Sequence, residues 1–260
     1  MAKILFRRHK KEYVKELDRE ITLAKERFFY VPDTNKDFIT ENGTIKAKDL
    51  TKKDGSTIKT NKGKEFILFS AQFKDEYSRL KRTAQIITPK DIGIIITETG
   101  INRDSKVVDA GTGSGALACY LAKICKEVTS YDIKDESIET GEANKEFLNI
   151  KNLTIKKKDV FTKIDETDVD TIILDMPEPY KAIKSVKKSL KIGGFLVTYV
   201  PNITQVSKFV EEIKKDDSFV YLRTIELIPR KWKIDNRIAR PNSQAIGHTA
   251  FLSFIRKIKS

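Results

Sequence analysis

The sequence predicts an α/β protein with a doubly wound, mostly parallel seven-stranded sheet, preceded by a small β domain. From residue 106 onward, apolar strand-like runs alternate with helical patterns, which indicates parallel strands with helices on both faces. The last two strand-like runs have no clear helix between them, so we expect a C-terminal antiparallel hairpin joined by the long loop 229–248. Turn signals at Gly43, Asp54-Gly55 and Asn61-Lys62-Gly63 divide residues 36–73 into short strands.

The predicted elements follow in chain order. Residues 1–35 open with a basic arm, and apolar residues spaced three or four apart then predict a helix over residues 10–30, a basic helical extension. Residues 36–73 form the small β domain, and a helix begins at Pro89, because proline suits the first helical turn. The strands of the large domain, residues 74–260, are expected at 106–109, 127–132, 152–157, 169–174, 194–200, 219–228 and 249–257.

A glycine-rich loop, residues 109–115, follows the first of these seven strands and leads into a helical pattern. Rossmann-like folds bind nucleotide-like ligands at such a loop, because glycines let the backbone approach a ligand without a Cβ in the way. Asp109 would repel a pyrophosphate but attract the ammonium and sulfonium groups of S-adenosylmethionine (SAM). We therefore predict a SAM site formed by Asp109, Gly111, Gly113, Ser114 and Gly115.

A second acidic residue, Asp132, ends the next predicted strand, 17 residues after Gly115. A carboxylate at this position can accept hydrogen bonds from both ribose hydroxyls of an adenosine. It would serve NAD equally well, so it supports a nucleoside ligand and not the choice of cofactor. The alternative interpretation is that Asp109 and Asp132 only cap the helices that follow them.

The charge balance points to a polyanionic partner. The chain has 260 residues, with 50 Lys and Arg against 37 Asp and Glu, which gives a net charge of +13. Dense charge of both signs is also typical of heat-adapted proteins, but an RNA or DNA partner better explains the excess. Because we find no membrane-spanning window and no secretory signal, and only two cysteines, Cys119 and Cys125, we expect a cytoplasmic protein.

A third acidic residue, Asp175, follows the apolar strand 171–174 and precedes two prolines, Pro177 and Pro179. A carboxylate on a stiffened loop at the ligand-binding edge of the sheet is a preorganised polar group. The alternative is a proline-ended strand whose acid caps a helix. Beside a SAM loop, Asp175 becomes the leading candidate for contact with a target base.

Residues from about 37 to the end resemble the tRNA (adenine-N1)-methyltransferases, class I SAM-dependent enzymes that modify adenine 58, and in some members adenine 57, of the T-loop. Four segments carry the resemblance: Gln85-Ile86-Ile87-Thr88-Pro89-Lys90-Asp91, then 109–115, then Leu174-Asp175-Met176-Pro177-Glu178-Pro179, and finally Arg240-Pro241 with Gly247-His248-Thr249-Ala250-Phe251-Leu252. The first and last segments are the more specific, and their order and spacing agree with the family.

The resemblance implies roles for individual residues. Gln85, the glycine-rich loop and Asp132 would hold SAM, Asp159 would recognise the cofactor adenine, and Asp175 would contact the target adenine. Pro177 would also face the substrate. The family is typically a homotetramer with a small N-terminal β domain, which suits residues 36–73 as an RNA-binding module.

Four further positions are weighed separately. Many family members carry Tyr where this chain has Thr88, so the aromatic contact near the active site is either absent or supplied by Tyr77, which is a candidate substrate contact. Arg240 is expected to contact RNA or the target base, although an Arg before Pro is commonly a solvated side chain or a phosphate contact. His248 is a candidate substrate contact, and the alternative is that its imidazole ties together backbone groups of its loop.

The predicted function is transfer of a methyl group from SAM to N1 of adenine in tRNA. Adenine N1 carries a lone pair and attacks the methyl carbon directly, so we expect neither a nucleophilic side chain nor a metal. Two alternatives stay open at this stage. One is a class I methyltransferase that acts on another RNA, a protein or a small molecule, and the other is a non-catalytic tRNA-binding subunit with the same fold.

Overall fold

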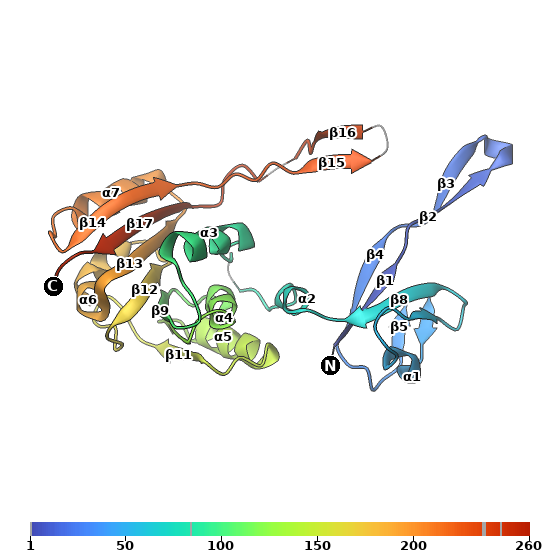
Figure 1. The fold of residues 1–260 in the computed structure, drawn as a ribbon, viewed down its shortest axis with the longest axis horizontal. Coiled ribbons are helices and arrows are strands. Elements are labelled where there is room, and N and C mark those ends of the chain that lie inside the picture. Colours follow the sequence, from blue (N-terminus) through green and yellow to red (C-terminus); the bar gives the residue numbers. More distant parts are fainter. Residues whose placement is uncertain (1, 84, 236–237, 245) are drawn as a thin grey trace. The chain divides into compact units, whose positions relative to one another are not determined.

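The computed structural model describes residues 2–83, 85–235, 238–244 and 246–260 and divides the chain into two compact units, Met1–Arg79 and Leu80–Ser260 (Figure 1). No helix among the described residues is long and apolar enough to cross a membrane.

The N-terminal unit is built on a four-stranded antiparallel sheet with the order β4-β1-β8-β7. The strands are β1 (Lys3–Arg7), β4 (Arg27–Val31), β7 (Thr57–Lys59) and β8 (Glu65–Ser70). Two hairpins and three short helices complete it: β2 (Lys10–Val14) with β3 (Arg19–Ala24), β5 (Phe38–Thr40) with β6 (Gly43–Ile45), η1 (Lys15–Leu17), α1 (Ala47–Leu50) and α2 (Phe73–Tyr77).

One face of this sheet forms the core of the N-terminal unit. Alternate residues of a strand point to the same face, and Leu5, Phe66 and Leu68 are almost completely buried together with Ile45 and Leu50 from the β5–β6 hairpin and α1. The apolar period of two in β1 and β8 therefore decides which face is covered.

The predicted helix over residues 10–30 is wrong, because these residues form β2, η1, β3 and β4. The apolar residues three or four apart include Tyr13 and Phe28, which are 55% and 57% exposed, so the expected apolar stripe is not buried. The stretch is rich in aromatic and β-branched residues, which favour strands, and β4 pairs with β1. Residues 1–35 are consequently part of the β unit, which extends to Arg79 and not to residue 73.

The C-terminal unit contains a seven-stranded sheet with the order β11-β10-β9-β12-β13-β17-β14, which confirms the predicted fold class. The first five strands are parallel, and β17 is antiparallel to both β13 and β14. The strands are β9 (Lys106–Ala110), β10 (Glu127–Asp132), β11 (Leu153–Lys157), β12 (Val169–Leu174), β13 (Leu190–Val200), β14 (Phe219–Ile225) and β17 (Phe251–Lys257).

Helices connect the parallel strands, and the strand order places the ligand edge. These helices are α3 (Pro89–Thr99) before β9, α4 (Ala116–Ala122), α5 (Asp135–Phe147), η2 (Pro179–Ala182), α6 (Ile183–Ser189) and α7 (Ile203–Ile213). The chain proceeds outward from β9 to β11 on one side and from β12 to β13 on the other. The carboxyl ends of β9 and β12 therefore flank the switch in strand order, where open α/β sheets bind ligands.

The loop expected between the last two strands contains a small hairpin of its own. Strands β15 (Trp232–Asp235) and β16 (Ile238–Pro241) follow β14 and precede β17 in the chain, and they pair antiparallel with each other (Figure 1).

Candidate active site

A cavity of about 350 Å³ lies at the carboxyl ends of the parallel strands of the C-terminal unit. Seven of the residues predicted from the sequence line it: Gln85, Gly111, Gly113, Asp132, Asp159, Asp175 and Pro177. The sequence interpretation missed the others, which are Tyr131, Ile133, Lys134, Ser137, Lys158, Val160, Phe161 and Met176. The structure therefore brings the ends of β9, β10 and β12 to one binding site.

The glycine-rich loop is held against two neighbouring strands. The amides of Gly111 and Thr112 both donate to the carbonyl of Tyr131, at N···O distances of 2.9 and 3.0 Å. Gly111 has a φ of +99°, and a Cβ built on it would lie 2.1 Å from the carbonyl oxygen of Asp175. A side chain at this position would strain the backbone and force the Gly111 or the Asp175 segment to shift.

Asp132 is fixed by three backbone amides. Its Oδ2 accepts from the Gly113 amide at 3.0 Å, and its Oδ1 accepts from the amides of Ile133 and Lys134 at 2.8 and 3.0 Å. The carboxylate is thus oriented at the cavity wall before any ligand arrives. Ile133 beside it is 63% exposed, and an isoleucine so exposed at the wall offers an apolar surface to a flat ligand. Its position directly after the acid was the signal from which the sequence could have identified it.

Asp109 lies beneath the loop and does not line the cavity. It is 1% exposed and accepts a hydrogen bond from the Ser130 hydroxyl at 2.7 Å. Burial raises the pKa of Asp109 to about 7, the Ser130 hydrogen bond opposes this shift, and the charges of Asp175 and Asp132 add to it. Asp109 is thus buried behind the loop and has no place on the cavity wall.

Ser114 and Gly115 are buried at the start of α4 and also lie outside the cavity lining. The Ser114 carbonyl accepts from Nδ2 of Asn144 on α5 at 2.8 Å, and a Cβ on Gly115 would lie 3.0 Å from Cα of Gly141 on the same helix. The end of the loop is therefore used to pack α4 closely against α5.

Asp175 extends the sheet at the end of β12 and faces the cavity together with Met176. Its amide donates to the Ala110 carbonyl at 2.8 Å, which continues the β9–β12 pairing by one residue. Burial raises the pKa of Asp175 to about 7. The carbonyl of Pro177 accepts from Nε2 of Gln205 at 2.9 Å, which anchors the following loop.

The lining of the cavity also combines a polar and an aromatic group. Asp159 is exposed, and its Oδ1 accepts from the amide of Phe161 at 2.8 Å. Phe161 and Val160 also line the cavity. A carboxylate beside an apolar wall suits a planar ring with an exocyclic amine.

The two specific segments of the sequence, 85–91 and 247–252, meet in a buried polar network around Asp91. This carboxylate is 0% exposed and pairs with Nζ of Lys90 at 2.6 Å. It also accepts from the hydroxyls of Thr88 at 2.9 Å, Thr249 at 3.2 Å and Tyr199 at 3.2 Å. Burial and the charges of Asp91 and Asp175 raise the pKa of Tyr199, so the network lies within electrostatic reach of the cavity. Thr88 serves as one of its hydroxyl donors.

Comparison with known proteins identifies the family to which the chain belongs. The family model described as tRNA methyltransferase complex GCD14 subunit matches residues 77–238. The tRNA (adenine(57)-N(1)/adenine(58)-N(1))-methyltransferase TrmI of Methanocaldococcus jannaschii is 36% identical, over 84% of this chain and 87% of that protein. The chain belongs to this tRNA methyltransferase family. A tRNA (adenine(58)-N(1))-methyltransferase TrmI of Thermus thermophilus is 32% identical, over 79% of this chain and 82% of that protein.

Solved structures of similar proteins agree on the class I methyltransferase fold. The tRNA (m1A58) methyltransferase TrmI of Aquifex aeolicus superimposes with a TM-score of 0.77 at 26% identity, over 99% of this chain and 97% of that one. A SAM-dependent O-methyltransferase of Thermotoga maritima gives 0.80 at 26% identity, over 99% and 93%.

Three of the predicted substrate contacts lie outside the cavity of this tRNA methyltransferase family member. Tyr77 is only 5% exposed, and its ring packs 5.6 Å from that of Phe73 on α2. Its ring has little exposed surface in this structure, and the aromatic contact with the substrate stays a prediction. Arg240 is exposed on β16, where it donates to the carbonyl of Pro241 at 3.4 Å.

His248 is held between the ends of two strands. Its Nδ1 faces the carboxylate of Glu226, its Nε2 lies 2.7 Å from the carbonyl oxygen of Pro201, and its ring packs 4.9 Å from that of Phe251. Both partners can only accept hydrogen bonds, so both ring nitrogens must carry protons. The hydrogen bond to Glu226 accordingly raises the pKa of His248. This geometry favours the alternative that the imidazole ties its loop to neighbouring segments.

Proposed function

We propose that this protein transfers the methyl group of SAM to N1 of adenine 58 in the T-loop of tRNA, with adenine 57 as a second target. The observation that carries the proposal is the place of Asp175, a preorganised carboxyl group on the wall of the cavity formed by the glycine-rich loop. The family membership supplies the substrate class. The name of the Methanocaldococcus jannaschii relative, which includes both adenines, supports the second target.

The residues of the cavity fit SAM. Gly111 and Gly113 line the cavity and bring no side chain into it, so the loop backbone is open to a ligand. We propose that Asp132 accepts the ribose hydroxyls, that Asp159 and Phe161 hold the adenine, and that Gln85 contacts the bound cofactor at the cavity mouth. Asp109, behind the loop, would stabilise the cationic end of the ligand through its charge.

The reaction requires the protein to position the methyl donor and the target adenine and to supply a nearby negative charge. SAM, when bound, would supply an electrophilic methyl group, whose bond to the sulfonium sulfur would break as adenine N1 forms its own bond to the methyl carbon, with a neutral thioether as the leaving group. We propose that Asp175 accepts a hydrogen bond from the exocyclic amine of the target adenine and stabilises the positive charge that develops on the ring. The base must leave its pairing in the folded tRNA, at an expense of a few kcal/mol. Binding of the basic protein to tRNA phosphates offsets part of this expense.

Further contacts with tRNA are proposed for other parts of the protein. Pro177 is exposed on the wall beside Asp175, and Arg240 is exposed on the β15–β16 hairpin. We propose that Pro177 packs against the target nucleoside and that Arg240 contacts a phosphate. His248 stays a candidate for a phosphate contact through its positive charge, alongside its structural role. The N-terminal unit, residues 1–79, is proposed as an RNA-binding module.

The proposed assembly is a homotetramer in the cytoplasm. The resemblance to the family supports the tetramer, and light scattering at micromolar concentration tests it, with a monomer as the contradicting result. Burial raises the pKa of both Cys119 and Cys125 to about 12, so both thiols are kept in the unreactive protonated form that suits a reducing compartment.

The central test combines Asp175→Ala and Asp175→Asn with a control at Asp104, an exposed carboxylate outside the cavity. We expect both Asp175 variants to lose at least about 100-fold in the methylation rate while SAM binding, measured by calorimetry, persists. Asp104→Ala should behave like the wild type. Near-normal turnover of Asp175→Ala would remove this residue from the mechanism.

The same reaction separates the rival functions. The similar protein of Thermotoga maritima is named an O-methyltransferase, so a hydroxyl acceptor is the second candidate. Mass spectrometry of T-loop fragments locates the methyl group on the base or on the ribose. A 2′-O-methylated product would favour the rival, and absence of SAM binding to the wild-type protein would favour a non-catalytic subunit.

A further inference from the structure

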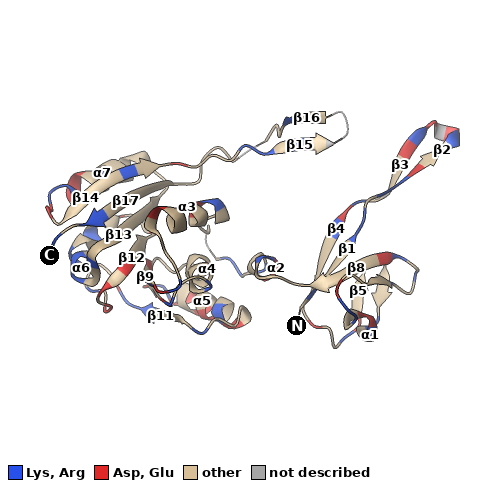
Figure 2. Ribbon diagram, viewed as in Figure 1, with Lys and Arg blue, Asp and Glu red and all other residues tan. Residues whose placement is uncertain are grey.

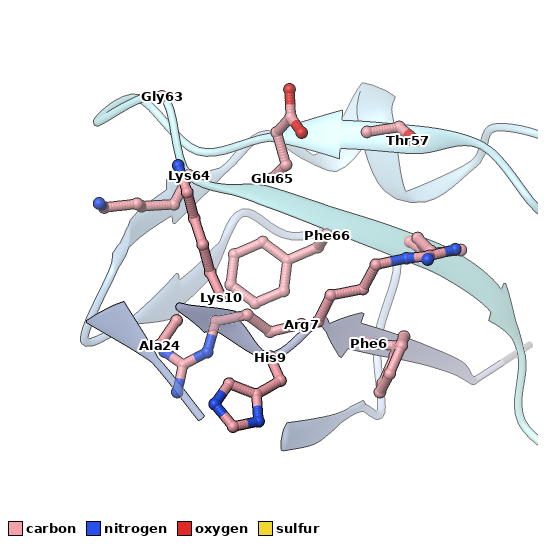
Figure 3. A pocket seen from close by; sticks show the side chains of 12 residues that line it. Phe6, Arg7, His9, Lys10, Ala24, Thr57, Gly63, Lys64, Glu65 and Phe66 are labelled. Carbon is pink, nitrogen blue, oxygen red and sulfur yellow. The ribbon is translucent and has the colours of Figure 1, made fainter. Parts of the chain in front are cut away.

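The N-terminal unit contains a basic cavity of about 790 Å³ that plays no part in the active site described above. Figure 3 shows its lining, which comes from the end of β1, the start of β2, the end of β3 and the strands and turn of β7 and β8. The cationic residues are Arg7, Arg8, Lys10 and Lys64, with His9 beside them, and Glu65 is the single carboxylate among the described residues of the lining. Lys and Arg are blue in Figure 2.

Three of the four cations of this cavity have no carboxylate partner among the described residues, unlike other cations of the unit. Lys3, Lys46 and Lys52 pair with aspartates at 2.6, 2.8 and 2.7 Å. Among the described residues, by contrast, no carboxylate lies within salt-bridge distance of Arg8, Lys10 or Lys64.

The one acid of the lining does not neutralise the site. Glu65 lies 3.1 Å from Lys59, and Arg7 pairs with Glu41 outside the cavity. Three like charges gathered without counter-charges repel one another, and a bound anion relieves this repulsion.

An aromatic surface continues from the cavity along the face of the sheet opposite the core. Phe6 lines the cavity, and its ring lies 4.7 Å from the ring of Phe28, its cross-strand partner on β4. Phe28 is followed by Phe69 at 6.5 Å in an edge-to-face arrangement. Phe28 is 57% exposed, which is unusual for a phenylalanine next to a packed aromatic cluster.

From this combination we propose that the cavity binds the sugar–phosphate backbone of an unpaired segment of the tRNA substrate, and that Phe28 stacks on one of its bases. Cations that track a backbone beside an exposed aromatic ring are the combination that single-stranded RNA requires. An acidic protein partner would match the charge but would not need an exposed phenyl ring beside it. The inference rests on the proposed function for the identity of the RNA.

The test uses the full-length protein and three variants: Lys10→Ala/Lys64→Ala, Phe28→Ala, and the control Lys48→Ala/Lys74→Ala. The control removes the same charge from exposed lysines outside the cavity. Binding of unmodified tRNA is titrated at several salt concentrations, and the Michaelis constant for tRNA is measured with the methylation rate at saturation.

We expect Lys10→Ala/Lys64→Ala to bind tRNA about tenfold more weakly and to lower the slope of log affinity against log salt by about 1.4, since each single-strand phosphate contributes about 0.7. Phe28→Ala should weaken binding with an unchanged salt slope, because stacking releases no ions, and Phe28→Trp should restore it. The rate at saturating tRNA and the affinity for SAM should stay at wild-type values in all variants.

Three outcomes decide the matter. Equal tRNA affinities of the cavity variant and the control overturn the inference, and so does a change of oligomeric state in the cavity variant, which would assign the surface to a second copy of the chain. Loss of tRNA affinity with a reduced salt slope supports it. If the wild-type protein forms no 1-methyladenosine, the proposed function fails instead, and tRNA binding by the same variants still reports on the cavity.

Discussion

Replacing Gly111 by alanine should separate a steric requirement of the active site from the ordinary strain of a left-handed residue. Alanine at a φ of +99° costs about 1–2 kcal/mol by itself. Its Cβ would also lie 2.1 Å from the Asp175 carbonyl oxygen, a backbone atom that cannot rotate away. Restoring an ordinary contact requires a shift of about 1 Å in one of the two segments, and overpacking of this kind costs a further 1–3 kcal/mol or so.

The matched control is Gly100→Ala. Gly100 has a φ of +69° at the end of α3, and a Cβ there meets no atom within 4 Å. This variant should therefore show the backbone strain alone, about 1–2 kcal/mol. For a chain of this size each kcal/mol lowers the melting temperature by roughly 2–4 °C, so calorimetry resolves the difference between the two variants.

The functional consequence is the sharper test. A displacement of Asp175 by about 1 Å should lower the single-turnover methylation rate by roughly 100-fold, whereas Gly100→Ala should keep the wild-type rate. The reasoning is refuted if Gly111→Ala has the same melting temperature as Gly100→Ala and methylates tRNA at the wild-type rate. If Gly111→Ala does not fold, the loss of folding beside a folded control still supports the steric requirement.

Three further predictions concern ionisable groups. Because Asp109 and Asp175 have pKa values raised from 3.8 to about 7, the cofactor-free fold should lose stability as the pH rises from about 4 to 7. A cationic cofactor favours the ionised forms of both carboxyl groups, so the affinity for SAM should increase between pH 6 and 8, with release of protons. A SAM affinity that calorimetry finds to be independent of pH would contradict this. Lys90→Met should destabilise the fold by about 3 kcal/mol in urea unfolding, because it leaves Asp91 buried without its cation. The double variant Lys90→Met/Asp91→Asn should recover part of this loss of stability. A double variant as unstable as the single one would count against the pairing. The pKa of His248, measured by NMR, should lie above its usual value of 6.5. The stability that His248 contributes should be complete below pH 6.5 and should disappear as the pH rises through the higher folded-state pKa. A titration midpoint at or below 6.5 would exclude an imidazolium that donates both of its hydrogen bonds.

The parallel sheet and the glycine-rich loop could be predicted from the sequence because their signals are local. Strand β9, the loop and α4 are neighbours in the chain, and their glycines and apolar runs specify the turn directly. Asp132 and Asp175 follow their strands by one residue or end them, so parallel topology alone places both at one edge.

The N-terminal strands could not be predicted in the same way. The spacing of Tyr13 and Phe28 matches a helix by coincidence. These residues form strands because the strands pair across the sheet, as Phe6 does with Phe28 and with Ile67. Strand propensity depends on such partners, and a partner about 60 residues away leaves no trace in a local pattern.

The sequence by itself determined the fold class, the glycine-rich loop and the three carboxylates that end or follow β10, β11 and β12. Only the tertiary structure decided that Asp109 sits behind the loop, that Gly111 is required by the Asp175 backbone, and that Asp91 gathers Lys90 and Thr249 from opposite ends of the domain. The physical reason is the same in each case. Burial, close contact and the pairing of a buried charge depend on distances between atoms that the order of residues does not specify.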